Sequence, residues 1–115
     1  MNNTNEDITK NSSFFVRQNG VLNKLDWRDI FYVHADGNYC YLHTGSKKFA
    51  VKISMRRLFE RLEAFGFIRI HKSYVVQAYY IDNINVNNNQ VSINGEQLPV
   101  GRAFKKALLD KVDVL

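Results

Sequence analysis

The stretch "FIRIHKSYVVQ", residues 67–77, decides how this chain is interpreted. Most of its residues are apolar, yet four polar side chains fall almost together in its middle: Arg69, His71, Lys72 and Ser73. Strand alternation sends the apolar positions largely into a core, namely Phe67, Ile68, Ile70, Val75 and Val76. The four polar residues are therefore expected at the mouth of a loop.

The length and composition fit one globular domain. The chain has 115 residues, of which 45% are hydrophobic, and this excludes a disordered protein. One cysteine, Cys40, cannot form an internal disulfide, and no apolar run approaches the roughly 18 residues of a membrane span. The polar N-terminus also lacks the apolar centre of a signal peptide. We expect a soluble cytoplasmic protein with no membrane contact.

Positive charge is concentrated in the second half of the chain. Residues 1–50 hold six basic and five acidic side chains, whereas residues 51–115 hold ten and six, within a net charge of +5. A basic excess on part of a small domain suits a polyanion such as nucleic acid, although an ordinary solvated surface can carry the same charge.

Turn residues divide the chain into short strands. Residues 1–13 are polar and are interpreted as a flexible leader or linker, so that the domain comprises residues 14–115. Asn19-Gly20 and Asn94-Gly95 predict tight hairpins, and Asp36-Gly37-Asn38 predicts a further turn. Strands are expected at 14–18, 21–25, 29–35, 39–44, 47–53, 79–86, 90–93 and 96–100, and the sequence at 67–77 is strand-like.

Two helices interrupt these strands. Ser54 is a candidate N-cap, and Gly66 is a candidate stop for the first helix. Its apolar residues recur at helical spacing, as expected for core packing: Met55, Leu58, Phe59 and Leu62. A terminal helix is expected within residues 102–115, from the spacing of Phe104, Leu108 and Val112. The fold class is therefore mainly β, with short antiparallel sheets and one or two small helices.

No set of residues supports catalysis or cofactor binding. The phosphate-binding patterns GxxxxGK[ST] and GxGxxG are missing, and His34, His43 and His71 lack the spacing of metal ligands. A nucleophilic pair of Cys40 with a histidine stays open but disfavoured, since Cys40 lies in a strand-like run. We expect no enzyme, no metal and no cofactor. No helix-turn-helix is evident either, so any DNA contact is expected from loops.

Several stretches together resemble the LytTR family of bacterial DNA-binding domains: "IFYVHADGNYCYLHT", "FIRIHKSYVVQ", "YIDNI" and "LPVGRAFKKAL". The resemblance covers essentially residues 14–112. Three positions depart from the usual pattern, with His34 in place of Glu, Gln77 in place of Asn, and Gly101 in place of Ser. The resemblance implies short antiparallel sheets with a small helix, and loops that enter successive major grooves of duplex DNA.

The resemblance also implies roles for individual residues. Four are expected to approach base edges: Asn38, Cys40, Lys72 and Arg102. Four more are expected at the DNA backbone: Arg69, His71, Ser73 and Lys105. For Arg69 and His71 a structural role in holding the loop is the alternative, and Tyr39 is expected in the core.

The same resemblance implies a biological setting. Such domains serve as effector domains of response regulators in two-component systems, behind a receiver domain that this chain does not contain. We expect a monomer in solution that places two copies on paired direct repeats in the DNA.

Two other functions remain open at this point. An RNA-binding β-domain would need exposed aromatic side chains for stacking, and the candidates are Tyr39, Tyr41, Tyr79 and Tyr80. These tyrosines are more often core residues in a small β-domain. A protein-interaction or ligand-sensing module without a nucleic-acid role is the second alternative.

Overall fold

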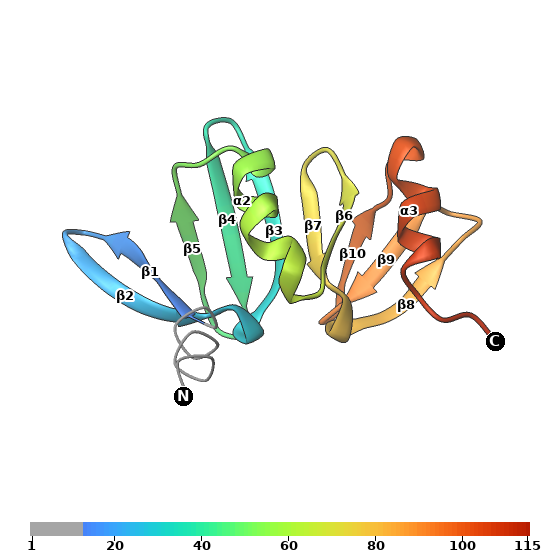
Figure 1. Cartoon of the computed structure of the whole chain (residues 1–115), viewed down its shortest axis with the longest axis horizontal. Coiled ribbons are helices and arrows are strands. Elements are labelled where there is room, and N and C mark those ends of the chain that lie inside the picture. The colour runs from blue at the N-terminus through green and yellow to red at the C-terminus, as the bar shows by residue number, and fades with distance from the viewer. Residues whose placement is uncertain (1–12) are drawn as a thin grey trace, which may run out of the picture.

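The structure is a computed structural model that describes residues 13–115 (Figure 1). Residues 1–12 of the expected leader lie outside the described residues, and Ser13 already begins the first strand. The strands are β1 (Ser13–Gln18), β2 (Val21–Asp26), β3 (Ile30–Asp36), β4 (Tyr39–Thr44), β5 (Lys48–Val51), β6 (Phe67–His71), β7 (Tyr74–Gln77), β8 (Ile81–Asn85), β9 (Gln90–Ile93) and β10 (Glu96–Pro99). The helices are α2 (Met55–Leu62) and α3 (Lys105–Asp110), with short 3-10 helices η1 (Trp27–Asp29), η2 (Glu63–Phe65), η3 (Ala78–Tyr80) and η4 (Arg102–Phe104).

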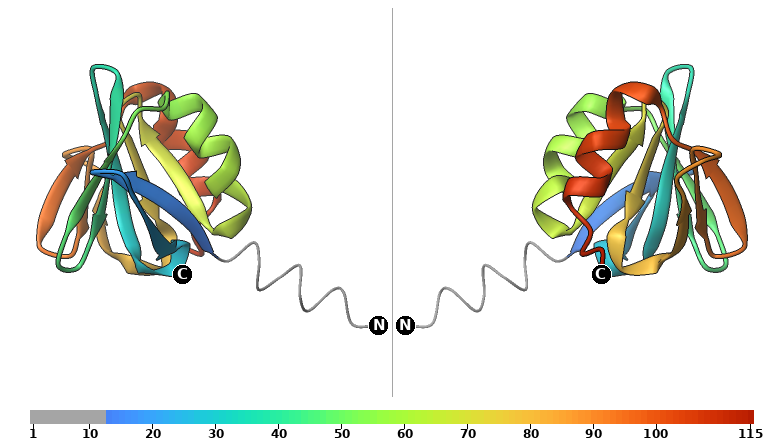
Figure 2. Two further views of the ribbon diagram at one scale, coloured as in Figure 1. Left: turned by 90° about the vertical axis from the view of Figure 1, so that its left-hand side faces the viewer. Right: turned by 90° about the vertical axis from the view of Figure 1, so that its right-hand side faces the viewer.

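The strands form three antiparallel sheets side by side (Figure 1). A two-stranded sheet, β1-β2, projects at one end, and a three-stranded sheet, β10-β9-β8, lies at the other. Between them is a five-stranded sheet of order β5-β4-β3-β7-β6. Both α-helices lie on the same side of the strands (Figure 2). The predicted fold class, mainly β with two small helices, is confirmed.

The tight turns follow from the residues that occupy them. Asn19 and Gly20 have φ of 51° and 78°, and Asn94 and Gly95 have φ of 49° and 82°. Positive φ at both central positions is the geometry of a type I′ hairpin turn, which Asn-Gly favours. Both predicted hairpins are therefore confirmed, with Gln18 paired to Val21 in the first.

The stretch 67–77 is apolar because its two strands separate two hydrophobic cores. Val75 belongs to the core beneath α2, whereas the adjacent Val76 belongs to the core beneath α3. In the same way Phe67 enters the first core and Ile68 the second. Successive strand residues point to opposite faces, so a strand that is buried on both faces cannot alternate apolar with polar residues.

The first helix begins and ends where the sequence predicts. The Ser54 side chain accepts a hydrogen bond of 3.2 Å from the backbone N–H of Arg57, as an N-cap does. Met55, Leu58 and Leu62 are buried against the first core. Gly66 follows η2 with φ of 87°, a conformation that glycine adopts without steric cost.

Several element boundaries differ from the sequence prediction, and three of these differences concern turns or the terminal helix. Asp29 ends η1 rather than starting a strand, and Tyr79 and Tyr80 lie in η3 rather than in the strand that follows. The Tyr80 hydroxyl donates 2.7 Å to the carbonyl oxygen of Arg28, which ties these two irregular turns together. The terminal helix stops at Asp110, so Val112 lies beyond it.

Candidate nucleic-acid interface

Four connections lie along one edge of the molecule, which we call the loop edge (top of Figure 1). They are the β3–β4 turn at residues 37–38, the β5–α2 segment at 52–54, the β6–β7 turn at 72–73, and residues 100–104 between β10 and α3. Each of the four connections carries at least one polar or basic side chain that could contact nucleic acid. The fold therefore gathers positions that are spread over residues 37–104 of the sequence.

Three hydrogen bonds fix these connections relative to one another. The backbone N–H of Ala35, near the end of β3, donates 2.9 Å to the carbonyl oxygen of Ser73 in the β6–β7 turn. The N–H of Gly101 donates 2.7 Å to the carbonyl of Ile70 in β6. The Cys40 thiol donates to the carbonyl of Ile53 across 3.3 Å, which joins the start of β4 to the segment before α2. The loop edge is thus held in one arrangement by bonds between its parts.

Arg69 organises the β6–β7 turn rather than extending from it. Its guanidinium donates 2.7 Å to the carbonyl of Lys72 and 3.4 Å to that of His71, and it lies 5.5 Å from the ring centre of Phe104. The guanidinium is a rigid planar group with several N–H donors, so it can bond to both carbonyl oxygens at once. The half-buried guanidinium therefore has a structural role in holding the turn, which was the alternative to the expected contact with the DNA backbone.

His71 and Ser73 complete the same turn. The Nδ1 atom of His71 accepts a hydrogen bond of 3.0 Å from the backbone N–H of Ser73, and the His71 ring packs edge-on against Tyr74. This contact holds the ring against its own turn. For His71 the structure favours the loop-holding role. The Ser73 side chain is half-buried beside it.

Three predicted base-reading side chains are exposed at the loop edge. Asn38 lies in the β3–β4 turn, Lys72 in the β6–β7 turn and Arg102 at the start of η4, and all three are exposed. Within residues 13–115, none of these three side chains forms a hydrogen bond or an ion pair with another residue. Contact of these three residues with bases stays a prediction, and their exposed side chains are accessible for it.

Cys40 is a correction to the prediction. Its side chain is completely buried in the first core, and burial raises the pKa of its thiol, so the group stays neutral. A side chain with no exposed surface cannot reach a base edge in this conformation. Cys40 instead positions the β3–β4 hairpin through its bond to Ile53. Its neighbour Tyr39, which was expected in the core, is 42% exposed.

Lys105 and Lys106 differ although they are adjacent. The ammonium group of Lys105 donates 2.8 Å to the carbonyl of Val86, which leaves two of its three donors available. Lys106 forms an exposed ion pair of 3.0 Å with Asp110. Lys105 therefore remains a candidate for a phosphate contact, whereas the charge of Lys106 has a partner within its own helix.

Two further basic residues at the loop edge were not predicted as site residues. A shallow groove between the β3–β4 turn and the start of α2 is lined by Asn38, Lys52 and Arg57, among others. Both Lys52 and Arg57 are exposed. The available sequence clue was the Ser54 N-cap, because it places both residues near the end of α2 that faces the loop edge.

The other candidate chemistries find no support in the described part of the chain. His34 stacks on Tyr74 and His43 stacks on Tyr32, with ring centres 4.5 Å and 4.2 Å apart. Residues 13–115 contain no group of three or more His, Cys, Asp or Glu side chains that could hold a metal. Among the helices that the structure describes, none is long and apolar enough to cross a membrane.

The chain is similar to several bacterial regulators. It is 28% identical over 88 residues to the sensory transduction protein LytT of Bacillus subtilis, covering 73% of this chain and 36% of that protein. It is 26% identical over 98 residues to the transcriptional regulatory protein LytR of Staphylococcus aureus, covering 82% and 40%. The chain thus spans 36–40% of the length of these curated relatives.

A solved structure has the same fold. The LytTr DNA-binding domain of a Bacillus cereus protein described as a methyl-accepting/DNA response regulator superposes with a TM-score of 0.77. The alignment covers 87% of this chain and 95% of that domain at 20% identity, and this likeness shows the fold. The profile of a family of DNA-binding domains, which is not a family of enzymes, matches residues 21–113. Because that match covers most of the sequence, the chain belongs to the LytTr DNA-binding domain family.

Proposed function

We propose that this domain binds duplex DNA sequence-specifically, with its loop edge in the major groove, as the effector part of a bacterial transcription regulator. The observation that carries the proposal is the exposed basic side chains of the loop edge, whose connections are fixed to one another by backbone hydrogen bonds. Duplex DNA presents a dense row of phosphates, and a rigid row of cations complements it. Preorganisation also reduces the ordering cost of binding.

Arg102, Lys72 and Asn38 are the proposed base readers. An arginine can bond bidentately to O6 and N7 of guanine, a lysine can donate to the same atoms, and an asparagine side chain can pair with N6 and N7 of adenine. The three residues occupy three different connections of the loop edge. Because these three residues lie on three different connections, the domain can contact bases at more than one place along the groove.

The remaining basic residues are proposed to contact phosphates. Lys52, Arg57 and Lys105 lie beside the readers and carry charge without a carboxylate partner among residues 13–115. Arg69 and His71 are proposed to act through the turn that they hold, since their polar atoms are already bonded to it. Phosphate contacts set the register of a protein on DNA, while base contacts provide the sequence preference.

The biological setting is proposed from the relatives. Their names describe sensory transduction and transcriptional regulation, and this chain spans less than half of each. We propose that the domain works in a cytoplasmic response regulator of a two-component system, together with a receiver domain. We further propose that the isolated domain is a monomer that occupies paired direct repeats as two copies.

Selection of binding sites from random duplexes tests this proposal. The unaltered domain is expected to enrich a short motif that occurs as two direct repeats spaced by about one or two helical turns, ~10 or ~20 base pairs. A variant with Lys72→Ala and Arg102→Ala should enrich no motif, whereas Arg28→Ala, at the opposite edge, should enrich the same motif. Failure of the unaltered domain to enrich any sequence at low salt would contradict the proposal.

RNA binding is less well supported, although Tyr79 is 86% exposed. Tyr79 lies in η3 at the edge opposite to Tyr39, and the two rings pair with different tyrosines, Tyr80 and Tyr41. Base stacking needs successive aromatic rings on one surface. Competition of labelled duplex DNA with single-stranded RNA of equal length distinguishes the two functions, and we expect the duplex to be preferred.

A further inference from the structure

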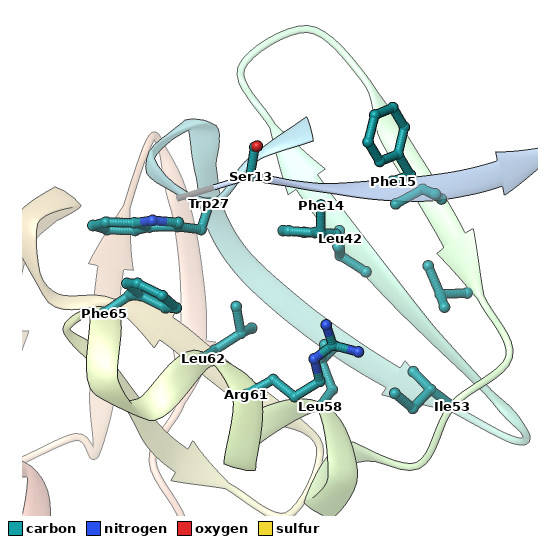
Figure 3. A pocket seen from close by; sticks show the side chains of 12 residues that line it. Ser13, Phe14, Phe15, Trp27, Leu42, Ile53, Leu58, Arg61, Leu62 and Phe65 are labelled. Carbon is teal, nitrogen blue, oxygen red and sulfur yellow. The ribbon is translucent and has the colours of Figure 1, made fainter. Parts of the chain in front are cut away.

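An apolar pocket lies between β1 and α2 (Figure 3). Its volume is about 220 Å³, and it is lined by side chains from six elements and by Ile53 of the β5–α2 segment. The apolar lining includes Phe14, Leu42, Ile53, Leu58, Leu62 and Phe65. Trp27 closes one end and stacks on Phe65 with ring centres 4.6 Å apart. No nucleic-acid role explains a concave apolar site of this kind.

One cation enters this otherwise apolar pocket. Figure 3 shows the guanidinium of Arg61 extending from α2 toward the middle of the lining side chains. No hydrogen bond or ion pair of Arg61 occurs within residues 13–115, and no described lining residue is acidic. A guanidinium has five N–H donors in a planar fork that matches a carboxylate. The pocket therefore offers a charge that an anion would complement.

Another polar group borders the same space. Ser13 contributes a hydroxyl to the lining beside Phe14. Small-molecule sites commonly combine apolar walls with a few polar groups of this sort.

From these observations we propose that the pocket binds a small amphipathic carboxylate, a molecule with a short alkyl or aryl body and one anionic head. The carboxylate pairs with Arg61, and the body packs among Leu58, Leu62 and Phe65. The volume lies below the ~300 Å³ of the smaller drug-type pockets, which limits the ligand to a compact molecule. This site shares Ile53 with the groove at the loop edge, but the proposal does not depend on DNA binding.

The single tryptophan of the chain makes the test direct. Because Trp27 forms part of the pocket, its fluorescence reports on occupancy. Octanoate, 1-octanol and octylamine are titrated into the unaltered chain at millimolar concentrations. We expect octanoate to bind about tenfold tighter than 1-octanol, since a bond to a charged group typically contributes a factor of this size. Octylamine should bind most weakly.

Variants on α2 then identify the charge that matters. Arg61→Gln should reduce octanoate affinity to that of 1-octanol, whereas Arg56→Gln, a matched change of an exposed arginine that does not line the pocket, should leave it unchanged. Val51→Phe, which places a larger side chain in the lining, should abolish binding of both compounds. Thermal unfolding and duplex binding verify that each variant is folded.

Several results would overturn the proposal. Equal affinities for octanoate and 1-octanol would show an apolar groove without anion selectivity. An equal loss of octanoate affinity from Arg56→Gln and Arg61→Gln would show a general effect of helix charge. No change in Trp27 fluorescence, together with unmoved backbone amide resonances of Leu58 and Leu62, would show that the pocket stays unoccupied.

Discussion

The two edges of the molecule differ in how their arginine side chains are paired. At the edge opposite to the loop edge, which contains η1 and η3 and which we call the turn edge, Arg28 pairs with Asp26 across 2.7 Å. That guanidinium lowers the pKa of Asp26 and shares both carboxylate oxygens. At the loop edge, Lys72 and Arg102 have no such partner among the described residues. Arg28 is thus compensated within the protein, whereas Lys72 and Arg102 leave their charge available for an external partner.

Salt dependence gives the largest expected difference between the two edges. If the loop edge neutralises about five phosphates, the logarithm of the duplex affinity should fall against log salt with a slope of about −4 to −5. Between about 50 and 200 mM salt the affinity then falls by roughly 250- to 1,000-fold. Fluorescence anisotropy with a labelled duplex at four or five salt concentrations measures this slope.

Matched charge removals sharpen that result. Lys105→Ala should make the slope shallower by about one unit on cognate and on scrambled DNA, because it removes one phosphate contact. Arg28→Ala removes the same charge from the turn edge and should leave the slope unchanged. A slope that responds equally to both substitutions would mean that the two edges do not differ in DNA contact.

Arg102→Ala is expected to have the next largest effect. Loss of a bidentate contact to guanine should cost roughly 1–3 kcal/mol on the cognate site and much less on random DNA. Since Arg102 is exposed and has no partner within residues 13–115, the substitution should leave thermal stability almost unchanged. Affinities for cognate and scrambled duplexes are compared at one salt concentration. An equal loss on both duplexes would reassign Arg102 to a phosphate.

Arg69 tests whether the loop edge must be held in shape. Arg69→Ala removes donors to two carbonyl oxygens and should lower the unfolding free energy by about 1–2 kcal/mol, together with cognate affinity. Arg69→Lys keeps the charge but not the planar fork, so it should fail in the same way. Denaturant unfolding and duplex binding are measured for both variants. Full DNA affinity in Arg69→Lys would indicate a charge contact with phosphate instead.

These residues also show what the sequence could predict. Asn19-Gly20, Asn94-Gly95 and Ser54 act through local backbone preferences, so the turns and the helix start are readable from neighbouring residues alone. The pattern of residues 67–77 predicts strand-like sequence with polar residues at the mouth of a loop, and the structure has two strands and a turn there. Its unbroken apolar character additionally reflects burial on both faces, which only the arrangement of the three sheets explains.

The site was predicted less completely, because contacts between distant segments decide it. Cys40 and Tyr39 are adjacent, and which of them faces the core depends on the register of β3 with β4. A slip of one residue exchanges the buried and the exposed face, and a short aromatic strand does not specify that register by itself. In the same way, the bonds from Arg69 to its own turn could not be derived from spacing, and Lys52 became a candidate only through the groove that it shares with Asn38.

The smallest expected effect is a dependence of stability on pH, and it arises from His43 in the five-stranded sheet rather than from the loop edge. His43 stacks on Tyr32 near the end of β4, and burial lowers its pKa below the ordinary value of 6.5, with a further decrease from the charge of nearby Lys48. The folded domain therefore binds this proton less readily than the unfolded chain does. The stabilisation is complete above pH 6.5 and is lost as the pH falls through 6.5 toward the lower pKa of the folded state. Unfolding by urea between about pH 7.5 and about pH 5.5 should show this decrease, and His43→Gln should reduce it. Persistence of the full decrease in His43→Gln would assign the proton to another group.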